Sequence, residues 1–186
     1  MLNYTDYLMV ISLPDYIVKE ISRYKRASVN VIGHFEGMHR TAFITISLQT
    51  RCKPFLAQPA ILKMGENIAT MPPIEIGLKG FGYFNISNTE KTIYAVIEQT
   101  PQTVNWFKLL KLQMGIKVKN FVPHIPIAQN LPSPVFNKLW PNFKNREYKV
   151  TFNVNSLTIL QKETFAEYAE WQVYKELFFA NKLSIF

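Results

Sequence analysis

The sequence predicts a single α+β domain made of two similar halves, at about residues 1–88 and 89–186. Each half has the same predicted order of strand, helix, alternating strand, helix and strand. The chain is 186 residues long, with 48% hydrophobic and 14% aromatic residues, which is typical of one globular domain with a sizeable core. Such a duplication places the two alternating strands in equivalent positions about an approximate two-fold axis.

The elements of the first half follow from apolar periodicity and from prolines. Tyr7 to Leu13 is an apolar run that ends at Pro14, which indicates a strand buried on both faces. Pro14-Asp15 begins a helix, and residues from about Ser28 to Arg40 are interpreted as a loop. A second helix is predicted for Pro59 to Met71, before Pro72-Pro73. The last strand segments of this half are predicted at Ile74–Leu78 and Phe81–Ile86.

The second half repeats this order. Thr92 to Ile97 is predicted to be a strand, and Pro101 begins a helix that Gly115 closes. Ser133 is interpreted as the N-cap of the next helix, with Pro134 at its first position, and Pro141 ends that helix. Further strands are predicted at Val150–Val154 and within Trp171–Phe179.

The two alternating strands, at residues 42–48 and 121–128, share one pattern. In the first strand one face is apolar, with Ala42, Ile44, Ile46 and Leu48, and the other carries Phe43, Thr45 and Ser47. In the second strand the apolar face has Ile125 and Ile127, and the other carries His124, Pro126 and Ala128. The quartets starting at Phe43 and at His124 are thus degenerate copies of one pattern, His-apolar-Thr-apolar.

The phrase Phe121-Val-Pro-His-Ile-Pro-Ile-Ala128 resembles the second motif of the two-histidine (2H) phosphoesterases, which include the bacterial 2'-5' RNA ligase-like proteins. Members of this family carry two His-x-Thr-x strands that face each other across a cleft. The resemblance covers nearly the whole chain and implies two pseudo-symmetric lobes, with antiparallel β-sheets forming a concave cleft and helices on the outside. The chain departs from the family at Phe43, where the first histidine is expected, and at Pro126, where the second threonine is expected.

The resemblance also implies a chemistry. One family histidine takes a proton from the attacking hydroxyl or water, and the other protonates the departing oxygen of a phosphodiester, often a 2',3'-cyclic phosphate. The threonines hold the phosphoryl oxygens, and no metal or nucleotide cofactor is required. By this resemblance His124 is the second histidine and Thr45 the first threonine. Phe43 cannot transfer a proton, and Pro126 offers a phosphate neither a hydroxyl nor an N–H.

Further residues are candidates for supporting this site. His39 is a possible substitute for the lost histidine, but it precedes Phe43 by roughly 13 Å of strand, so we expect no replacement unless the loop folds back. Substrate-binding candidates are Thr45, Phe43, Ser47 and Arg51. Phe43 could stack a base or simply fill space. Arg51, just past the motif strand, could reach a phosphate, although a solvated strand end explains it equally well.

Charge and composition limit the partners. Twenty-one Lys and Arg against 13 Asp and Glu give a net charge of +8 and a pI near 9.5, which suits RNA or a nucleotide. The single cysteine, Cys52, excludes an internal disulfide framework. No apolar run approaches the length of a membrane span, and no cationic segment precedes the first apolar stretch, so a cytoplasmic location is expected.

The leading hypothesis is a diverged 2H phosphoesterase-like protein that binds RNA termini or (cyclic) nucleotides with weak or no phosphodiesterase activity. Losing one general acid or base typically costs about 10²–10⁴ in rate, which is why low activity is expected. One alternative is an active 2',3'-cyclic phosphodiesterase that uses His124 with a histidine of the loop before Phe43. Another is a non-catalytic scaffold whose cleft contacts a protein.

Overall fold

The computed structural model of the protein describes residues 4–117 and 121–182. The predicted order of strand, helix, strand, helix and strand occurs twice along the chain, and two more strands follow. Their bounds are β1 (Thr5–Ser12), α1 (Asp15–Ile32), β2 (Phe43–Cys52), α2 (Pro54–Ala69), β3 (Ile74–Asn85), β4 (Glu90–Ile97), α3 (Pro101–Gln113), β5 (His124–Pro132), α4 (Ser133–Leu139), a 3₁₀ turn (Trp140–Asn142), β6 (Lys149–Val154), β7 (Ser156–Glu163) and β8 (Gln172–Phe178).

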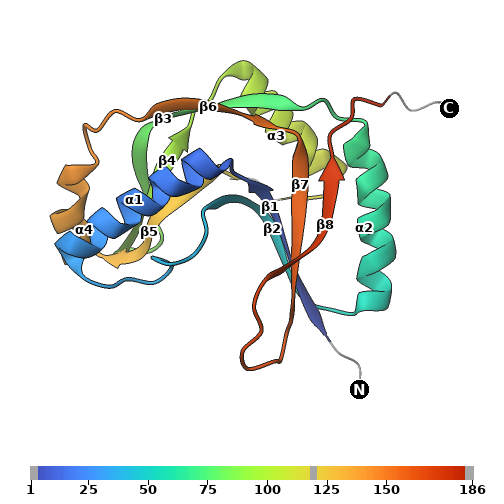
Figure 1. Cartoon of the computed structure of the whole chain (residues 1–186), viewed down its shortest axis with the longest axis horizontal. Coiled ribbons are helices and arrows are strands. Elements are labelled where there is room, and N and C mark those ends of the chain that lie inside the picture. Colours follow the sequence, from blue (N-terminus) through green and yellow to red (C-terminus); the bar gives the residue numbers. More distant parts are fainter. Residues whose placement is uncertain (1–3, 118–120, 183–186) are drawn as a thin grey trace.

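The strands form two four-stranded antiparallel sheets (Figure 1). Sheet A has the order β2-β1-β7-β8, and sheet B has the order β5-β4-β3-β6. The predicted α+β class with antiparallel sheets is therefore confirmed. The sheets do not coincide with the halves of the sequence, because β3 joins sheet B and the last two strands join sheet A.

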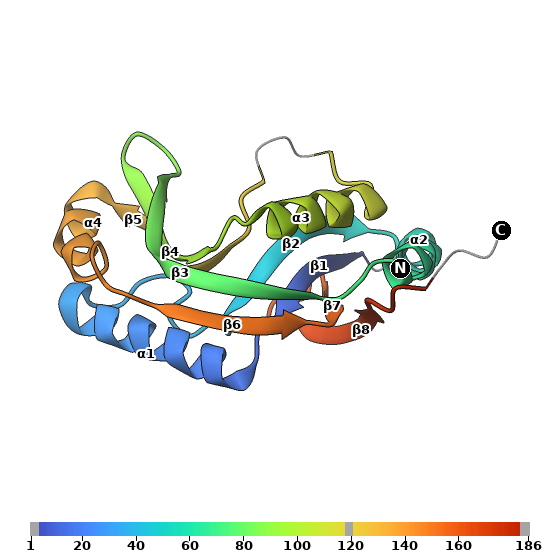
Figure 2. The same cartoon turned by 90° about the horizontal axis from the view of Figure 1, so that it is seen from above.

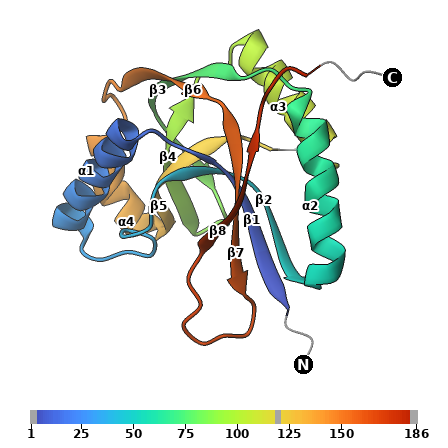
Figure 3. The same ribbon diagram turned by 45° about the vertical axis from the view of Figure 1, so that its right-hand side comes forward.

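The helices cover the sheets from several sides. In Figure 2, α1 and α3 lie on opposite sides of β3 and β6, and Figure 3 shows α1 with α4 on one side of the strands and α2 on the other. One apolar core joins both sheets and all four α-helices of the described residues; its fully buried members include Ile11, Ile17, Ile44, Ile68, Ile76, Ile93, Leu110 and Ile125. No helix of the described chain is both long enough and apolar enough to cross a membrane.

Helix α1 is longer than the sequence predicts. The loop expected from Ser28 begins only after Ile32, and Gly33, with φ +78°, ends the helix. The reason is tertiary: Ser28 is buried and donates its hydroxyl to the carbonyl of Tyr24, and Lys25 is also buried. Two polar residues that indicate a solvated segment in the sequence are instead covered by packing.

Other boundaries also differ from the predictions. Helix α2 begins at Pro54, not Pro59, which lies inside it. β3 is one continuous strand, and Gly80, with φ +68°, lies where its pairing with β4 shifts register. Ser133 does not cap α4, because Pro132 precedes the helix and the Ser133 hydroxyl donates to the carbonyl of Thr89. β7 was not predicted as a separate strand.

Both motif strands contain a β-bulge directly after the third motif position. Val10 pairs with Thr45 while Met9 pairs with Ser47, so Ile46 has no partner. In sheet B, Tyr94 pairs with Pro126 while Ile93 pairs with Ala128, so Ile127 has none. Side chains alternate along a strand, so an extra residue moves every later side chain to the other face.

The bulges correct three sequence predictions. Ser47 lies opposite Met9, a core residue, and not on the face of Thr45. Ala128 lies opposite Ile93 and is completely buried, although the alternation predicted it beside His124. Leu48, predicted in the core, is 54% exposed.

A second bulge follows in each motif strand, at a residue with positive φ. Arg51 (φ +54°) donates its backbone N–H to the Asp6 carboxylate at 2.9 Å, and Asn130 (φ +53°) donates its N–H to the Thr92 hydroxyl at 3.3 Å. In both cases the acceptor is a residue of the neighbouring strand that has no pairing partner at the bulge, Asp6 in β1 and Thr92 in β4. This shared device supports the internal duplication inferred from element order.

We expect Asp6→Ala to lower the free energy of unfolding by about 1–3 kcal/mol, because it leaves the N–H of the bulge without its acceptor. Asp6 also accepts the Thr164 hydroxyl at 2.7 Å, so the change loosens the β7–β8 connection as well. Urea denaturation followed by circular dichroism measures the difference. Glu167→Ala, in the exposed β7–β8 loop, is the control; equal stability of the two variants would contradict this role for Asp6.

Candidate functional site

Four motif positions lie on sheet faces turned away from the core. We call these the motif faces: that of sheet A carries Phe43 and Thr45, and that of sheet B carries His124 and Pro126. β2 and β5 are the edge strands of their sheets and lie against each other. The two strands that carry the degenerate motifs therefore lie side by side.

The motif face of sheet A offers one free hydroxyl. Thr45 is exposed, and its side chain makes no hydrogen bond within residues 4–117 and 121–182. Phe43, half-buried, lies opposite Ser12, whose hydroxyl is hydrogen-bonded to that of Thr158 at 2.8 Å. On this motif face Thr45 is therefore the group that is available to a ligand oxygen.

On sheet B, His124 is held by two aromatic rings. Its ring centroid lies 5.0 Å from that of Phe84 and 5.3 Å from that of Tyr94, both in edge-to-face geometry. Such contacts stabilise aromatic pairs by about 0.5–1.5 kcal/mol beyond simple burial. These neighbours come from β3 and β4, so three strands fix the orientation of one imidazole.

The backbone fixes which nitrogen of His124 can react. Nδ1 lies 2.8 Å from the carbonyl oxygen of Val122. A carbonyl only accepts, so Nδ1 carries the hydrogen, and Nε2 presents a lone pair in the neutral ring. Burial lowers the pKa of His124, which outweighs the opposing effect of the Val122 hydrogen bond. At neutral pH the group is therefore a hydrogen-bond acceptor or base.

Tyr94 depends on a glycine beneath it. A Cβ at Gly82 would lie 3.1 Å from both the Tyr94 hydroxyl oxygen and the ring carbon that bears it. Burial raises the pKa of Tyr94, so its hydroxyl keeps its proton at neutral pH, and no partner for that hydroxyl is found in the described part of the chain. Tyr94 faces Pro126 across the strand pair.

Sequence reasoning did not identify Phe84, Tyr94 or Gly82 as site residues. A signal existed, since Tyr94 alternates with buried Ile93 and Ala95 and must face away from the core. Only the strand order shows that this face is shared with His124. Pro126 itself fits because β5 is an edge strand, where a missing backbone N–H is tolerated.

Arg51 lies at the far end of β2. Its guanidinium carbon lies 6.0 Å from the ring centroid of Phe165, in the β7–β8 loop. It follows Thr45 by six residues, or roughly 20 Å of strand. Arg51 is therefore not on the motif faces. Ser47 is not on them either, because it lies opposite the core residue Met9.

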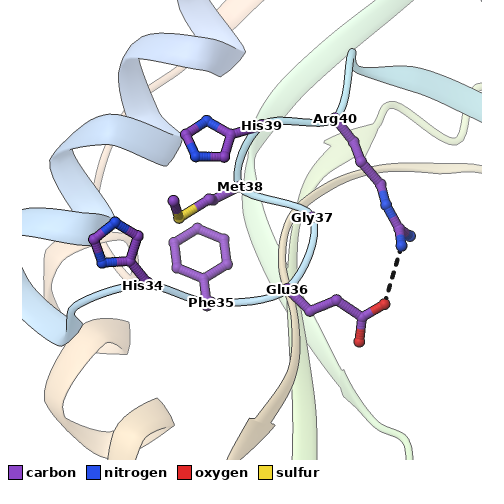
Figure 4. A pocket seen from close by; sticks show the side chains of 7 residues that line it. All are labelled: His34, Phe35, Glu36, Gly37, Met38, His39 and Arg40. Carbon is purple, nitrogen blue, oxygen red and sulfur yellow. Dashed lines mark hydrogen bonds and ion pairs between the residues drawn. The ribbon is translucent and has the colours of Figure 1, made fainter. Parts of the chain in front are cut away.

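His39 belongs to a separate feature, the loop between α1 and β2. The loop residues His34, Phe35, Glu36, Gly37, Met38, His39 and Arg40 line a cavity of about 530 Å³ (Figure 4). Neither Thr45 nor His124 belongs to its lining. A Cβ at Gly37 would lie 3.6 Å from the Gln129 side chain, so the loop adjoins β5 five residues beyond His124.

The fold matches that of known structures over nearly its full length. TT0787 of Thermus thermophilus is 18% identical with a TM-score of 0.66, and covers 94% of this chain and 98% of its own. LigT of E. coli complexed with 3'-AMP is 14% identical with a TM-score of 0.68, over 95% and 98%. Usb1 of Kluyveromyces marxianus is 9% identical with a TM-score of 0.54, over 95% and 98%.

These likenesses define the class as the two-sheet α+β fold of LigT. A sequence profile of the 2'-5' RNA ligase superfamily matches residues 29–164, which include both motif strands. The chain therefore belongs to the 2'-5' RNA ligase superfamily, the 2H phosphoesterases. None of the curated proteins compared with the chain matches its sequence.

We expect the imidazole of His124 to titrate below the ordinary histidine value of about 6.5. The unfolded chain then binds this proton more readily than the folded chain. The stability that neutral His124 contributes is complete above about pH 6.5 and is lost as the pH falls through the folded pKa. A pH titration of the imidazole NMR signals measures the shift.

Phe84→Ala tests the cause of this shift. Removing the ring exposes His124 to water, so its pKa should rise toward the ordinary value. Asn85→Ala, an exposed neighbour at the end of β3, should leave it unchanged. An unaltered titration in Phe84→Ala would show that the aromatic wall is not responsible.

Proposed function

We propose that the protein is a diverged 2H phosphoesterase that binds RNA termini or (cyclic) nucleotides between the motif faces, with weak or no phosphodiesterase activity. The observation that carries the proposal is the single reactive imidazole. His124 presents one lone pair, and the position that should hold the second proton-transfer group is occupied by Phe43. A two-proton displacement therefore lacks one of its two groups.

The groups that remain suit a nucleotide end. A ribose hydroxyl can donate to Nε2 of His124, and the Thr45 hydroxyl can donate to a phosphoryl oxygen. Phe84 and Tyr94 provide aromatic surface beside His124, of the kind on which bases stack. The net charge of +8 favours a polyanion, and LigT, which shares the fold, was crystallised with 3'-AMP.

We expect the protein to bind 3'-AMP or 2',3'-cyclic AMP, and Thr45→Val to weaken this binding by about 10- to 100-fold. A hydrogen bond to a charged phosphate contributes about 1.5–3 kcal/mol, and valine keeps the shape of threonine without the hydroxyl. Isothermal titration calorimetry at low salt measures the affinity, which should fall as salt is added.

Thr41→Val provides the control, because Thr41 is an exposed threonine just before β2. If both variants bind as tightly as the unaltered protein, the ligand does not contact Thr45. If the protein binds no nucleotide or oligonucleotide at low salt, a scaffold that contacts another protein becomes the better hypothesis.

Restoring the motifs should restore catalysis. We expect Phe43→His combined with Pro126→Thr to raise kcat/KM for 2',3'-cyclic AMP hydrolysis by about 10²–10⁴, because it returns one proton-transfer group and one phosphate-binding hydroxyl. The edge position of β5 should tolerate the change at Pro126. Adding His124→Ala to the double variant should abolish the gain.

The alternative of an active phosphodiesterase gives the opposite result. In that case the unaltered protein would turn over the cyclic nucleotide rapidly, and His39→Ala and His124→Ala would each destroy the activity. Slow or absent turnover, unaffected by His39→Ala, is expected for the diverged binder.

A further inference from the structure

The α1–β2 loop gathers soft metal ligands on one side. Two of the three histidines of the chain, His34 and His39, lie in it together with Met38. Figure 4 shows these three side chains pointing to one side of the loop, while Glu36 and Arg40 point to the other. All five residues line the same cavity of about 530 Å³.

The backbone of this loop is held from several directions. The buried Lys25 donates its ammonium to the carbonyls of Gly37, at 3.1 Å, and Arg40, at 2.8 Å. Glu36 and Arg40 form an ion pair at 3.1 Å. Two turns inside the loop add backbone hydrogen bonds, in which Met38 N–H donates to the carbonyl of Phe35 and Arg40 N–H donates to the carbonyl of Gly37. A loop ordered in advance loses less entropy when it binds a ligand.

The two imidazoles are available. His34 and His39 are exposed, and neither has a side-chain hydrogen bond or ion pair within the described residues. A neutral imidazole binds a metal through either ring nitrogen, so each can supply one ligand atom. Rotation of the exposed rings costs little, because no partner must be released.

The composition of the ligand set selects the metal. Among the described residues, no group of three or more His, Cys, Asp or Glu could hold a metal ion, and the nearby Glu36 is paired with Arg40. Calcium and magnesium prefer oxygen ligands, and zinc usually takes four from imidazole, thiolate and carboxylate. Two imidazoles with a thioether instead suit a soft ion, and thioethers favour Cu(I).

We propose that the loop binds one Cu(I) ion through Nδ1 or Nε2 of His34 and His39 and Sδ of Met38. The site is distinct from the motif faces, because its cavity includes neither Thr45 nor His124. Since Arg40 precedes Phe43 by three residues, a bound ion would also brace the start of β2.

The experiment uses the full chain with Cys52→Ser, because the thiol of Cys52, the single cysteine of the chain, would also bind Cu(I). Cu(I) is titrated without oxygen against a chromophoric Cu(I) chelator, which gives stoichiometry and affinity. We expect one ion per chain. Losing an outer-shell partner already costs about 10- to 100-fold in metal affinity, so Met38→Leu or His34→Ala should cost at least as much.

Met114→Leu is the matched control, because it makes the same exchange in a half-buried methionine at the end of α3, and it should bind Cu(I) like the parent. The proposal is overturned if the parent binds no Cu(I), or if Met38→Leu binds as tightly as Met114→Leu. If the parent bound Zn(II) more tightly than Cu(I), the proposed assignment of a soft ligand set would be wrong.

A second measurement does not depend on the variants folding alike. Methyl-labelled methionine gives six NMR signals in the parent, one for each methionine, and Met38→Leu identifies the signal of Met38. That signal should move on adding one equivalent of Cu(I), while the other five stay in place. An unmoved Met38 signal at full occupancy would exclude the thioether as a ligand.

Discussion

The register of the two motif strands is the constraint on which the site depends. Ile46 and Ile127 each interrupt the pairing directly after the third motif position. Residues before each bulge keep the alternation that sends positions 43, 45, 124 and 126 to the motif faces, and residues after it are reversed. Each motif is therefore limited to two outward positions, and a third polar residue in sequence, such as Ser47, turns toward the core.

The electrostatics of His124 follow from this placement. The motif face of sheet B puts Phe84 and Tyr94 against the imidazole, and the Val122 carbonyl accepts the hydrogen on its Nδ1. The ring is thereby oriented and kept neutral, which leaves Nε2 to accept a hydrogen from a ligand. In a complete two-histidine site a second imidazole would exchange protons with the other oxygen. In this chain the apolar Phe43 stands at the corresponding motif position, which is why the proposed function is binding with weak or no proton transfer.

Periodicity predicted most elements because the core is formed by regular alternation, as in β4, whose residues 93, 95 and 97 are buried. It could not predict the first bulge of each motif strand, because Ile46 and Ile127 are apolar and fit an unbroken pattern. It also ended α1 too early, because the polar side chains of Lys25 and Ser28 are buried by packing and hydrogen-bond to backbone carbonyls. Phe84 and Tyr94 could not be predicted for a related reason: their contact with His124 depends on which strands become neighbours.

The two motif strands share backbone features although their side chains differ. At the second bulge a carboxylate, Asp6, accepts the N–H in sheet A, and a hydroxyl, that of Thr92, accepts it in sheet B. Different side chains thus accept the N–H of an equivalent bulge, because an N–H left without an acceptor is costly in either sheet. A phenylalanine in place of a histidine at position 43 carries no such cost, because the side chain of Phe43 has no polar atom that needs a partner. The backbone of the two motif faces therefore does not require a histidine at position 43, which is consistent with the proposed binding function.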